Sequence, residues 1–149
     1  MMVEVLVAAA IITASILAAM AVTQKAVFVS RQSFHATQAA FLLEEGAEAV
    51  RIARDNAWSN ISSLTVGTNY YPTFSGGTWT LSTSSSTVGI FTRSVTIASV
   101  NRDNTTKDII SSGGTLDSGT KLVTVTVSWA EGGTTITKTL QFYIMDIFS

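Results

Sequence analysis

An almost unbroken apolar run fills residues 1–24, and this run constrains the fold more than any other part of the sequence. It contains a single charged residue, Glu4, and the first basic side chain of the chain is Lys25. A helix of about 20 residues rises about 30 Å, which matches the hydrocarbon thickness of a bilayer. The run therefore predicts a helix whose side chains need lipid or neighbouring subunits to cover them.

Glu4 is out of place in this run, because a charge at the centre of a bilayer costs about 2.5–3.5 kcal/mol on insertion scales. No basic side chain lies nearby along the sequence to neutralise it. We therefore expect its partner to come from a second copy of the chain. The alternative is a plain single-span anchor whose acid reaches the membrane surface.

A secretory signal peptide is the competing interpretation of the run. Such a peptide begins with basic residues, has a shorter apolar stretch and ends at an Ala-x-Ala cleavage site. Here an acid comes first and the helical pattern continues beyond Lys25, so the sequence favours a retained helix. Thr13 and Ser15 interrupt the run, and we expect their hydroxyls to donate to helix carbonyls four residues earlier.

The composition changes near residue 57. Residues 1–57 are rich in Ala, Val, Ile, Leu and Glu, whereas residues 58–149 are dominated by Thr, Ser, Gly, Val and Ile and hold the only proline, Pro72. A helical part followed by a β part predicts the α+β class. We expect one long N-terminal helix, about residues 2–56, whose C-terminal half packs on a small antiparallel β-sheet.

These patterns divide the chain into two segments. Residues 1–25 are predicted to be a hydrophobic helix for a membrane or filament core, and residues 26–149 a head domain. The head combines the amphipathic second half of the helix with the sheet. Val27, Phe34 and Phe41 are spaced by seven and form an apolar stripe. We expect the later stripe residues to face the sheet and the earlier ones to meet other subunits.

Three local features of the helix carry smaller predictions. Glu48 with Arg51, and Arg51 with Asp55, have the spacing of surface ion pairs, each contributing about 0.2–0.5 kcal/mol. Gly46 is expected to weaken the helix by about 1 kcal/mol relative to alanine. Polar residues predict that the helix ends between residues 55 and 60.

Alternating apolar and hydroxyl side chains predict the sheet. Three valines and Trp129 alternate with Thr and Ser from residue 122, a turn follows at Ala130-Glu131-Gly132-Gly133, and apolar residues mark a returning strand to Ile144. This is a strong hairpin signal, and the sheet can bury its apolar face against the helix. Further strands are predicted over residues 90–100 and 79–82, with loops over residues 82–87, 101–107 and 111–120.

The sequence argues against several chemistries. Cysteine is absent, which excludes disulfides and thiolate metal sites. The net charge is −1, so no basic surplus can neutralise nucleic-acid phosphates. His35 is the only histidine, and no nucleophile–base pair or carboxylate dyad is recognisable. Asp103, Asp108, Asp117 and Glu131 lie in predicted loops without calcium-loop spacing, so we predict no enzyme, metal site or cofactor.

Two tripeptides, Asn60-Ile61-Ser62 and Asn104-Thr105-Thr106, match the N-glycosylation motif. Such tripeptides arise by chance in a chain rich in Ser and Thr, so Asn60 and Asn104 are glycosylation candidates by motif alone. The pairs Gly113-Gly114 and Gly132-Gly133 are turn residues and not phosphate loops, because no Lys-Ser/Thr follows them.

The first twelve residues, Met-Met-Val-Glu-Val-Leu-Val-Ala-Ala-Ala-Ile-Ile, closely resemble the mature N-terminus of type IV pilins and their type II secretion relatives, the class III signal family. Chains of that family begin after a prepilin peptidase cut with a methylated residue, followed by a few apolar residues, a Glu and an apolar helix. The motif covers roughly the first 25 residues, and the helix-then-sheet layout extends a looser match over the whole chain.

The resemblance implies roles for individual residues. Glu4 pairs with the N-terminal amine of a neighbouring subunit during filament growth, and Met1 carries that amine, in N-methylated form. Two charges that are costly alone in an apolar medium become tolerable as a pair, and an acid in the first turn suits the helix dipole. The side chains expected to pack in the helical core are Val5, Leu6, Val7, Ile11, Ile12, Ile16, Leu17, Val27, Phe34 and Phe41.

The chain departs from the family pattern at two points. The family acid is usually the fifth residue of the mature chain, whereas here it is the fourth. The family often has a helix-breaking proline in the apolar segment and a cysteine pair closing a C-terminal loop, and this sequence has neither. Without a disulfide, we expect strand pairing and burial of Phe142, Ile144 and Phe148 to hold the C-terminal end.

The function implied by the resemblance is that of a pilin, a structural subunit of an extracellular type IV pilus that supports adhesion, motility or DNA uptake. Such a chain begins as a single span in the cytoplasmic membrane, is cut by prepilin peptidase, and is built by an inner-membrane assembly platform into a homopolymer. One alternative is a minor pilin or a type II secretion pseudopilin. A second is a membrane-anchored binding module, which predicts no polymer and no requirement for Glu4.

Overall fold

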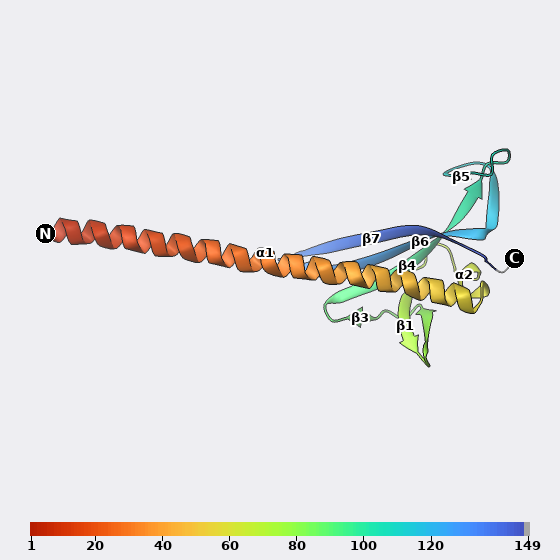
Figure 1. The fold of residues 1–149 in the computed structure, drawn as a ribbon, viewed down its shortest axis with the longest axis horizontal. Helices are drawn as coiled ribbons and strands as arrows, with labels where there is room; N and C mark the ends of the chain where they lie inside the picture. The colour runs from red at the N-terminus through yellow and green to blue at the C-terminus, as the bar shows by residue number, and fades with distance from the viewer. Residues whose placement is uncertain (148–149) are drawn as a thin grey trace. The chain divides into compact units, whose positions relative to one another are not determined.

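The computed structural model describes residues 1–147, whose helices and strands are shown in Figure 1. They fall into two compact units, Met1–Gln38 and the part of the chain from Ala39 onward. Helix α1 spans Met2–Asn56 and helix α2 spans Ser59–Ser62. The strands are β1 (Tyr71–Ser75), β2 (Thr78–Ser82), β3 (Thr87–Val88), β4 (Phe91–Arg102), β5 (Ile109–Ile110), β6 (Thr115–Glu131) and β7 (Thr134–Met145).

Helix α1 is continuous over the range predicted for it and ends at Asn56, as the polar residues indicate. The expected bonds from hydroxyls inside the apolar run are also confirmed. Thr13 Oγ1 donates to the carbonyl oxygen of Ala9 at 2.8 Å, and Ser15 Oγ donates to that of Ile11 at 2.8 Å. Because these hydroxyls are satisfied within the helix, they add little polarity to its surface.

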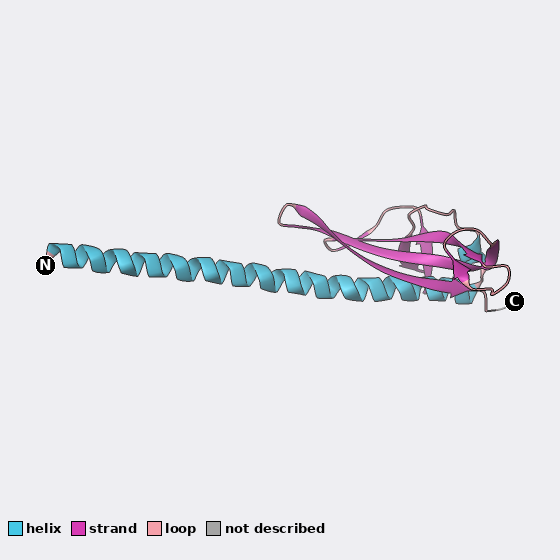
Figure 2. Ribbon diagram, turned by 90° about the horizontal axis from the view of Figure 1, so that it is seen from above, coloured by secondary structure: helices cyan, strands magenta, loops and turns pink. Residues whose placement is uncertain are grey.

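The main sheet of the second unit is antiparallel, in the order β3-β4-β6-β7, with β5 also paired to β4. Figure 2 shows the strands in magenta. The predicted hairpin is confirmed as β6 and β7, in which Trp129 lies opposite Ile136. Gly132 and Gly133 form its turn with φ of 57° and 84°, a left-handed conformation that suits glycine. The strands predicted over residues 90–100 and 79–82 are confirmed as β4 and β2.

Sequence patterns do not reveal β1, β3 and β5. Strands β1 and β2 form a separate two-stranded sheet, and Pro72 lies in β1 opposite Leu81. A proline is tolerated there because each strand of such a sheet is an edge. Strands β3 and β5 have only two residues each, too few for an alternating pattern. The predicted loops are therefore shorter than expected, since β3 begins at Thr87, β4 continues to Arg102 and β6 begins at Thr115.

The core of the second unit lies between the last part of α1 and one face of the main sheet. Val123, Val125 and Val127 are fully buried, which confirms the predicted apolar face. The helix contributes mostly small side chains, which allow it to lie close to a sheet rich in valine. This packing of the second half of α1 on an antiparallel sheet is the predicted α+β arrangement. The buried helix positions are Ala39, Gly46, Ala47, Ala49, Val50 and Ala53.

Gly46 has a packing role besides the mild helix weakness expected from its propensity. A Cβ atom at this position would lie 2.7 Å from Cγ1 of the buried Val125 and 3.1 Å from Cδ of Arg93. Real Cβ atoms essentially never come as close to a neighbour as the first of these distances. A glycine therefore lies inside this long helix because the sheet passes directly beneath it.

The expectation that the later stripe residues face the sheet is wrong for Phe41, which is 69% exposed. The helix instead turns Ala39 and Ala47 into the core, so its buried face is made of small residues and not of the aromatic stripe. At the C-terminal end, Ile144 is buried and Phe142 packs against the core, as predicted. The expectation for Phe148 falls outside the described residues.

The predicted ion pairs of the helix are half correct. Arg51 pairs with Glu48 at 3.3 Å, as expected. Asp55, however, pairs with its neighbour Arg54 at 2.7 Å and not with Arg51. The guanidinium of Arg51 lies instead 5.2 Å from the ring centroid of Phe142, so it covers an aromatic ring on β7.

Strand β6 bends where its pairing with β4 shifts register, between residues 99 and 100 of β4. Next to this bend, Arg102 Nε donates to Asp117 Oδ2 at 2.5 Å and its Nη2 donates to Thr120 Oγ1 at 3.2 Å. The placement of Asp117 and Glu131 in loops is therefore wrong, because both belong to β6. Alternation is interrupted by Gly and Asp in this stretch, which hides the start of the strand.

Candidate assembly site

The first unit, Met1–Gln38, is helical from Met2 onward and leaves almost all of its side chains exposed. Every residue of this unit that we predict to pack in a helical core is among them, with exposed fractions from 54% to 69%. Fully burying one such side chain gains about 1.5–3 kcal/mol. These exposed apolar residues are Val5, Leu6, Val7, Ile11, Ile12, Ile16, Leu17, Val27 and Phe34.

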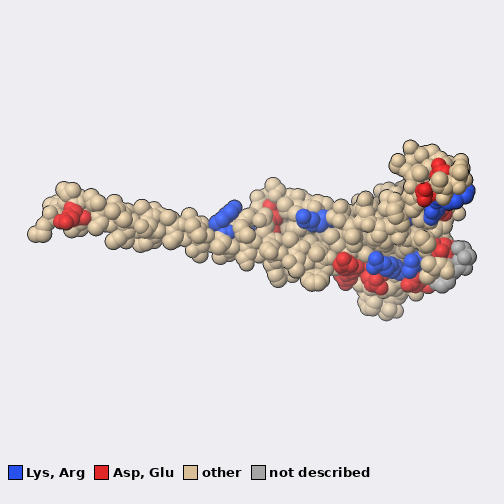
Figure 3. Space-filling model, turned by 45° about the horizontal axis from the view of Figure 1, so that its top comes forward, with Lys and Arg blue, Asp and Glu red and all other residues tan. Residues whose placement is uncertain are grey.

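The N-terminal part of α1 is long enough and apolar enough to cross a membrane. None of its most apolar stretch is buried within the protein. Figure 3 shows this stretch as a surface without Lys, Arg, Asp or Glu, in agreement with the sequence between Glu4 and Lys25. The expectation of an N-terminal segment compatible with membrane anchoring therefore holds.

Glu4 lies in the first turn of α1 and is exposed. The helix begins beside it, since the N–H of Val5 donates to the carbonyl oxygen of Met1 at 3.2 Å. Backbone N–H groups at a helix start lack partners within the helix, and their partial positive charge favours a nearby carboxylate. The first turn therefore offers Glu4 a favourable electrostatic position, although the side chains that follow it are apolar.

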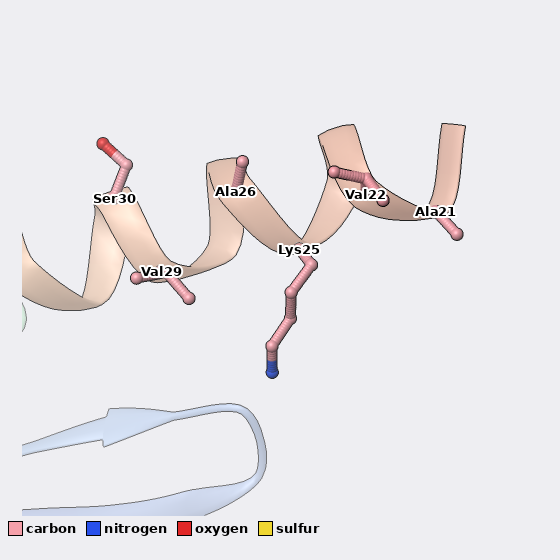
Figure 4. A pocket seen from close by; sticks show the side chains of 6 residues that line it. All are labelled: Ala21, Val22, Lys25, Ala26, Val29 and Ser30. Atoms are coloured by element: carbon pink, nitrogen blue, oxygen red, sulfur yellow. The ribbon is translucent and has the colours of Figure 1, made fainter. Parts of the chain in front are cut away.

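The far end of the apolar run carries a hollow on the helix surface, drawn in Figure 4. Close by, two basic side chains lie near one aromatic ring. The ammonium of Lys25 is 5.4 Å from the ring centroid of Phe28, and the guanidinium of Arg31 is 5.7 Å from it. This clustering marks where the helix surface changes from apolar to charged. The residues that line the hollow are Ala21, Val22, Lys25, Ala26, Val29 and Ser30.

Arg93 is a buried charge of the second unit that the sequence analysis did not single out. Its side chain is 4% exposed, forms an ion pair with Glu45 of α1, and lies 5.3 Å from the ring of Trp79. Its Nε atom is buried without a hydrogen-bond partner. The alternation of β4 could have indicated its burial, because Arg93 occupies an inward position between Phe91 and Val95.

Two aspartates of the second unit are held by local donors. Asp103 Oδ1 accepts hydrogen bonds from the backbone N–H of Thr106 at 2.9 Å and of Thr105 at 2.7 Å, and these bonds lower its pKa. The pKa of Asp117 is lowered chiefly by its hydrogen bond from Arg102. Within residues 1–147, no group of three or more His, Asp or Glu side chains is arranged to hold a metal ion.

The two glycosylation tripeptides lie in different surroundings. Asn60 lies in α2, and its Nδ2 atom, to which a glycan would be attached, donates to the carbonyl oxygen of Ala53 at 2.9 Å. Asn104 lies in an exposed turn, and there the side-chain oxygen accepts from Thr115 Oγ1 at 2.7 Å. Because that bond uses the side-chain oxygen and not Nδ2, the geometry favours Asn104 over Asn60.

No family model matches this chain, and it matches neither a curated protein nor a solved structure. Function must therefore be inferred from the chain's own residues. The features that bear on it are the exposed apolar helix, the single acid in its first turn and the α+β head that follows.

Proposed function

We propose that this chain is a pilin-like subunit that polymerises through its N-terminal helix into an extracellular filament of the type IV pilus kind. One observation carries the proposal: a helix with an acid in its first turn exposes apolar side chains from Val5 to Phe34. Between Glu4 and Lys25 the helix is almost entirely apolar on all sides, and such a helix is stable only inside a larger apolar environment. In the filament, that environment consists of the same helices from other subunits.

Assembly transfers these side chains from lipid into contacts between helices. Leaving lipid for a helical bundle gains little hydrophobic energy, so close packing and the pairing of charges must supply specificity. Glu4 provides that charge, and the resemblance to pilins makes the N-terminal amine of a neighbouring subunit its partner. An unpaired buried charge costs several kcal/mol, so only arrangements that bring acid and amine together are stable.

Before assembly, the same helix anchors the subunit as a single span in the cytoplasmic membrane, with the head on the outer side. The support for this step is the length and apolar character of the N-terminal part of α1. The assembly platform and the prepilin peptidase are partners that the resemblance implies. The α+β head then lies on the outside of the filament, where it meets the surroundings of the cell.

Substitution of Glu4 tests the proposal. Glu4→Ala and Glu4→Gln should leave the amount of subunit in the membrane unchanged and should abolish or strongly thin the filaments released by shearing. Gln24→Ala, a change of the polar residue at the other end of the apolar run, is the matched control and should assemble normally. Electron microscopy and immunoblots of the membrane and sheared fractions measure both quantities.

Normal filaments from both Glu4 variants would contradict the pairing role. The same experiment separates the alternatives. A minor pilin or a secretion pseudopilin predicts that this chain is a rare component of the sheared material. A membrane-anchored binding module predicts that the wild-type chain forms no polymer and that Glu4 can be replaced without effect.

A further inference from the structure

The second unit contains an open surface cavity of about 310 Å³ beside the end of α1, and four of its lining residues, Asn56, Asn60, Ser63 and Thr80, are exposed. Its walls come from α1, from the short helix α2 and the residue after it, and from strand β2. Cavities that bind small molecules in proteins start at roughly 300 Å³, so this one has room for a ligand of modest size. The lining residues are Ala53, Asn56, Asn60, Ser63, Thr78, Trp79, Thr80 and Leu81.

The lining carries no charged side chain and many neutral polar groups. Two asparagine amides and three hydroxyls share the walls with one indole ring and two aliphatic side chains. A lining of this kind gives no charge to hold a phosphate or a carboxylate. The composition therefore points to a neutral, polar ligand that also has an apolar surface.

Hydrogen bonds within the walls already use several of their polar groups, and the groups that remain determine which hydrogen bonds a ligand can form. Asn60 Nδ2 donates to the carbonyl oxygen of Ala53 at 2.9 Å, and Asn56 Nδ2 donates to Thr78 Oγ1 at 3.0 Å. Ser63 Oγ donates to the carbonyl oxygen of Ser59 at 2.6 Å, and Thr80 Oγ1 to that of Thr73 at 3.3 Å. The hydroxyls of Ser63 and Thr80 and one N–H of each asparagine amide are thus used within the protein, and the amide and hydroxyl oxygens of the wall keep acceptor capacity.

Trp79 is held in one orientation by its neighbours. The guanidinium of Arg93 lies 5.3 Å from its ring, and Phe74 packs on it edge to face with centroids 5.5 Å apart. Arg93 in turn is fixed by its ion pair with Glu45, and Gly46 leaves room for its stem. The indole is therefore a preformed apolar wall of the cavity, which reduces the entropy lost on binding.

We propose that this cavity is a binding site for a neutral saccharide. The hydroxyls of a sugar ring supply the donors that the amide and hydroxyl oxygens of the wall can accept, and the C–H face of the ring packs against Trp79. A hexose or N-acetylhexosamine unit matches the modest volume and the absence of charge. This inference goes beyond the filament function and does not depend on it, because every lining residue belongs to the second unit.

Ligand-observed saturation-transfer NMR tests the site on the full-length chain. The chain is held in micelles of a zwitterionic detergent without a sugar headgroup, and glucose, galactose, mannose and N-acetylglucosamine are added separately. At least one sugar should receive saturation from the protein. Asn56→Leu and Thr80→Val remove wall acceptors while keeping side-chain size, and each should weaken binding about tenfold, equivalent to about 1.4 kcal/mol.

Thr139→Val, at an exposed position of β7, is the matched control and should bind like the wild type. Thermal unfolding of each variant separates loss of binding from loss of folding, and a second pocket variant, Trp79→Phe, keeps an aromatic wall of smaller area. Absence of saturation transfer to all four sugars would overturn the proposal. Binding that survives both Asn56→Leu and Thr80→Val would overturn it too, because the sugar would then lie elsewhere.

Discussion

Gly46 is the residue at which packing and helix propensity make opposite predictions. Replacing it with alanine gains about 1 kcal/mol of helix propensity but overpacks the contact with Val125, at a cost of about 1–3 kcal/mol. Because the new Cβ would lie 2.7 Å from a buried methyl group, we expect the packing term to win. Gly46→Ala should therefore lower the free energy of unfolding by up to about 2 kcal/mol in thermal or denaturant unfolding of the full-length chain in micelles.

The Val125→Ala background provides the control for this prediction. Removing the methyl groups of Val125 removes the close contact, so Gly46→Ala should cost less in that background than in the wild type. A Gly46→Ala chain that is as stable as the wild type would show that the sheet can move away from the helix. The glycine would then have no packing role.

Asp117 makes stability depend on pH through its bond to Arg102. An aspartate in an unfolded chain has a pKa of about 3.9, and the fold lowers the pKa of Asp117 below that value. Its contribution is therefore fully present above about pH 3.9 and is lost as the pH falls through the lower folded-state pKa. Asp117→Asn should unfold at a lower temperature than the wild type at neutral pH, and the difference should shrink in acid.

Thermal unfolding of both chains from neutral pH down to about pH 2.5 measures this difference. Thr139→Val, which changes no titrating group, should keep a constant offset from the wild type over the same range. If Asp117→Asn also shows a constant offset, the carboxylate contributes through packing and not through its charge.

At the residue scale, the sequence identifies residues that break a local pattern, but it does not identify residues whose role depends on tertiary contacts. Glu4 stands out because a charge in an apolar run violates the local pattern. The packing role of Gly46 and the exposure of Phe41 are missed because propensity and spacing describe one helix alone, whereas the sheet determines which helix face needs small residues. Arg93 is overlooked because its partners, Glu45 and Trp79, are distant in sequence.

The apolar stripe of α1 is the element on which assembly is predicted to depend. Phe34 lies in the first unit and is 60% exposed, so a charge there should disturb little within a single chain. Between packed helices, the same charge would be buried without a partner. Phe34→Asp should therefore abolish filaments while the unfolding temperature of the subunit stays unchanged, as measured by electron microscopy and circular dichroism.

Gln32→Asp is the matched control for Phe34→Asp. Two residues along an α-helix correspond to a turn of about 200°, so Gln32 points almost opposite to Phe34. This variant should keep its filaments if the stripe is the contact face. Equal loss of filaments in both variants would mean that the helix is surrounded on all sides. Normal filaments from Phe34→Asp would mean that the stripe does not contact neighbouring subunits.

Among the β elements, length decides what the sequence can predict. Strands β6 and β7 alternate over many residues around a glycine turn, so the hairpin is predicted with its turn. Strands β3 and β5 have two residues each and are defined only by their pairing with β4. The start of β6 is missed for a related reason, since its pairing shifts register at the bend. Such features depend on tertiary contacts that no local pattern records.

At the scale of the whole molecule, the two units of the chain differ in whether their apolar side chains are buried within the chain. In the second unit, small residues of the helix pack against valines of the sheet and form a buried core. The first unit leaves its apolar side chains exposed. That contrast supports an assembly in which the helix becomes buried only when many chains come together.

Cryo-electron microscopy of filaments sheared from cells, combined with the intact mass of their main protein, tests this account most directly. We expect thin filaments built of this chain, with the N-terminal helices at the centre and Glu4 next to the N-terminal amine of a neighbouring subunit. The mass should identify the first residue and a methyl group on it. Sheared material without filaments, or filaments whose main protein is a different chain, would contradict the account.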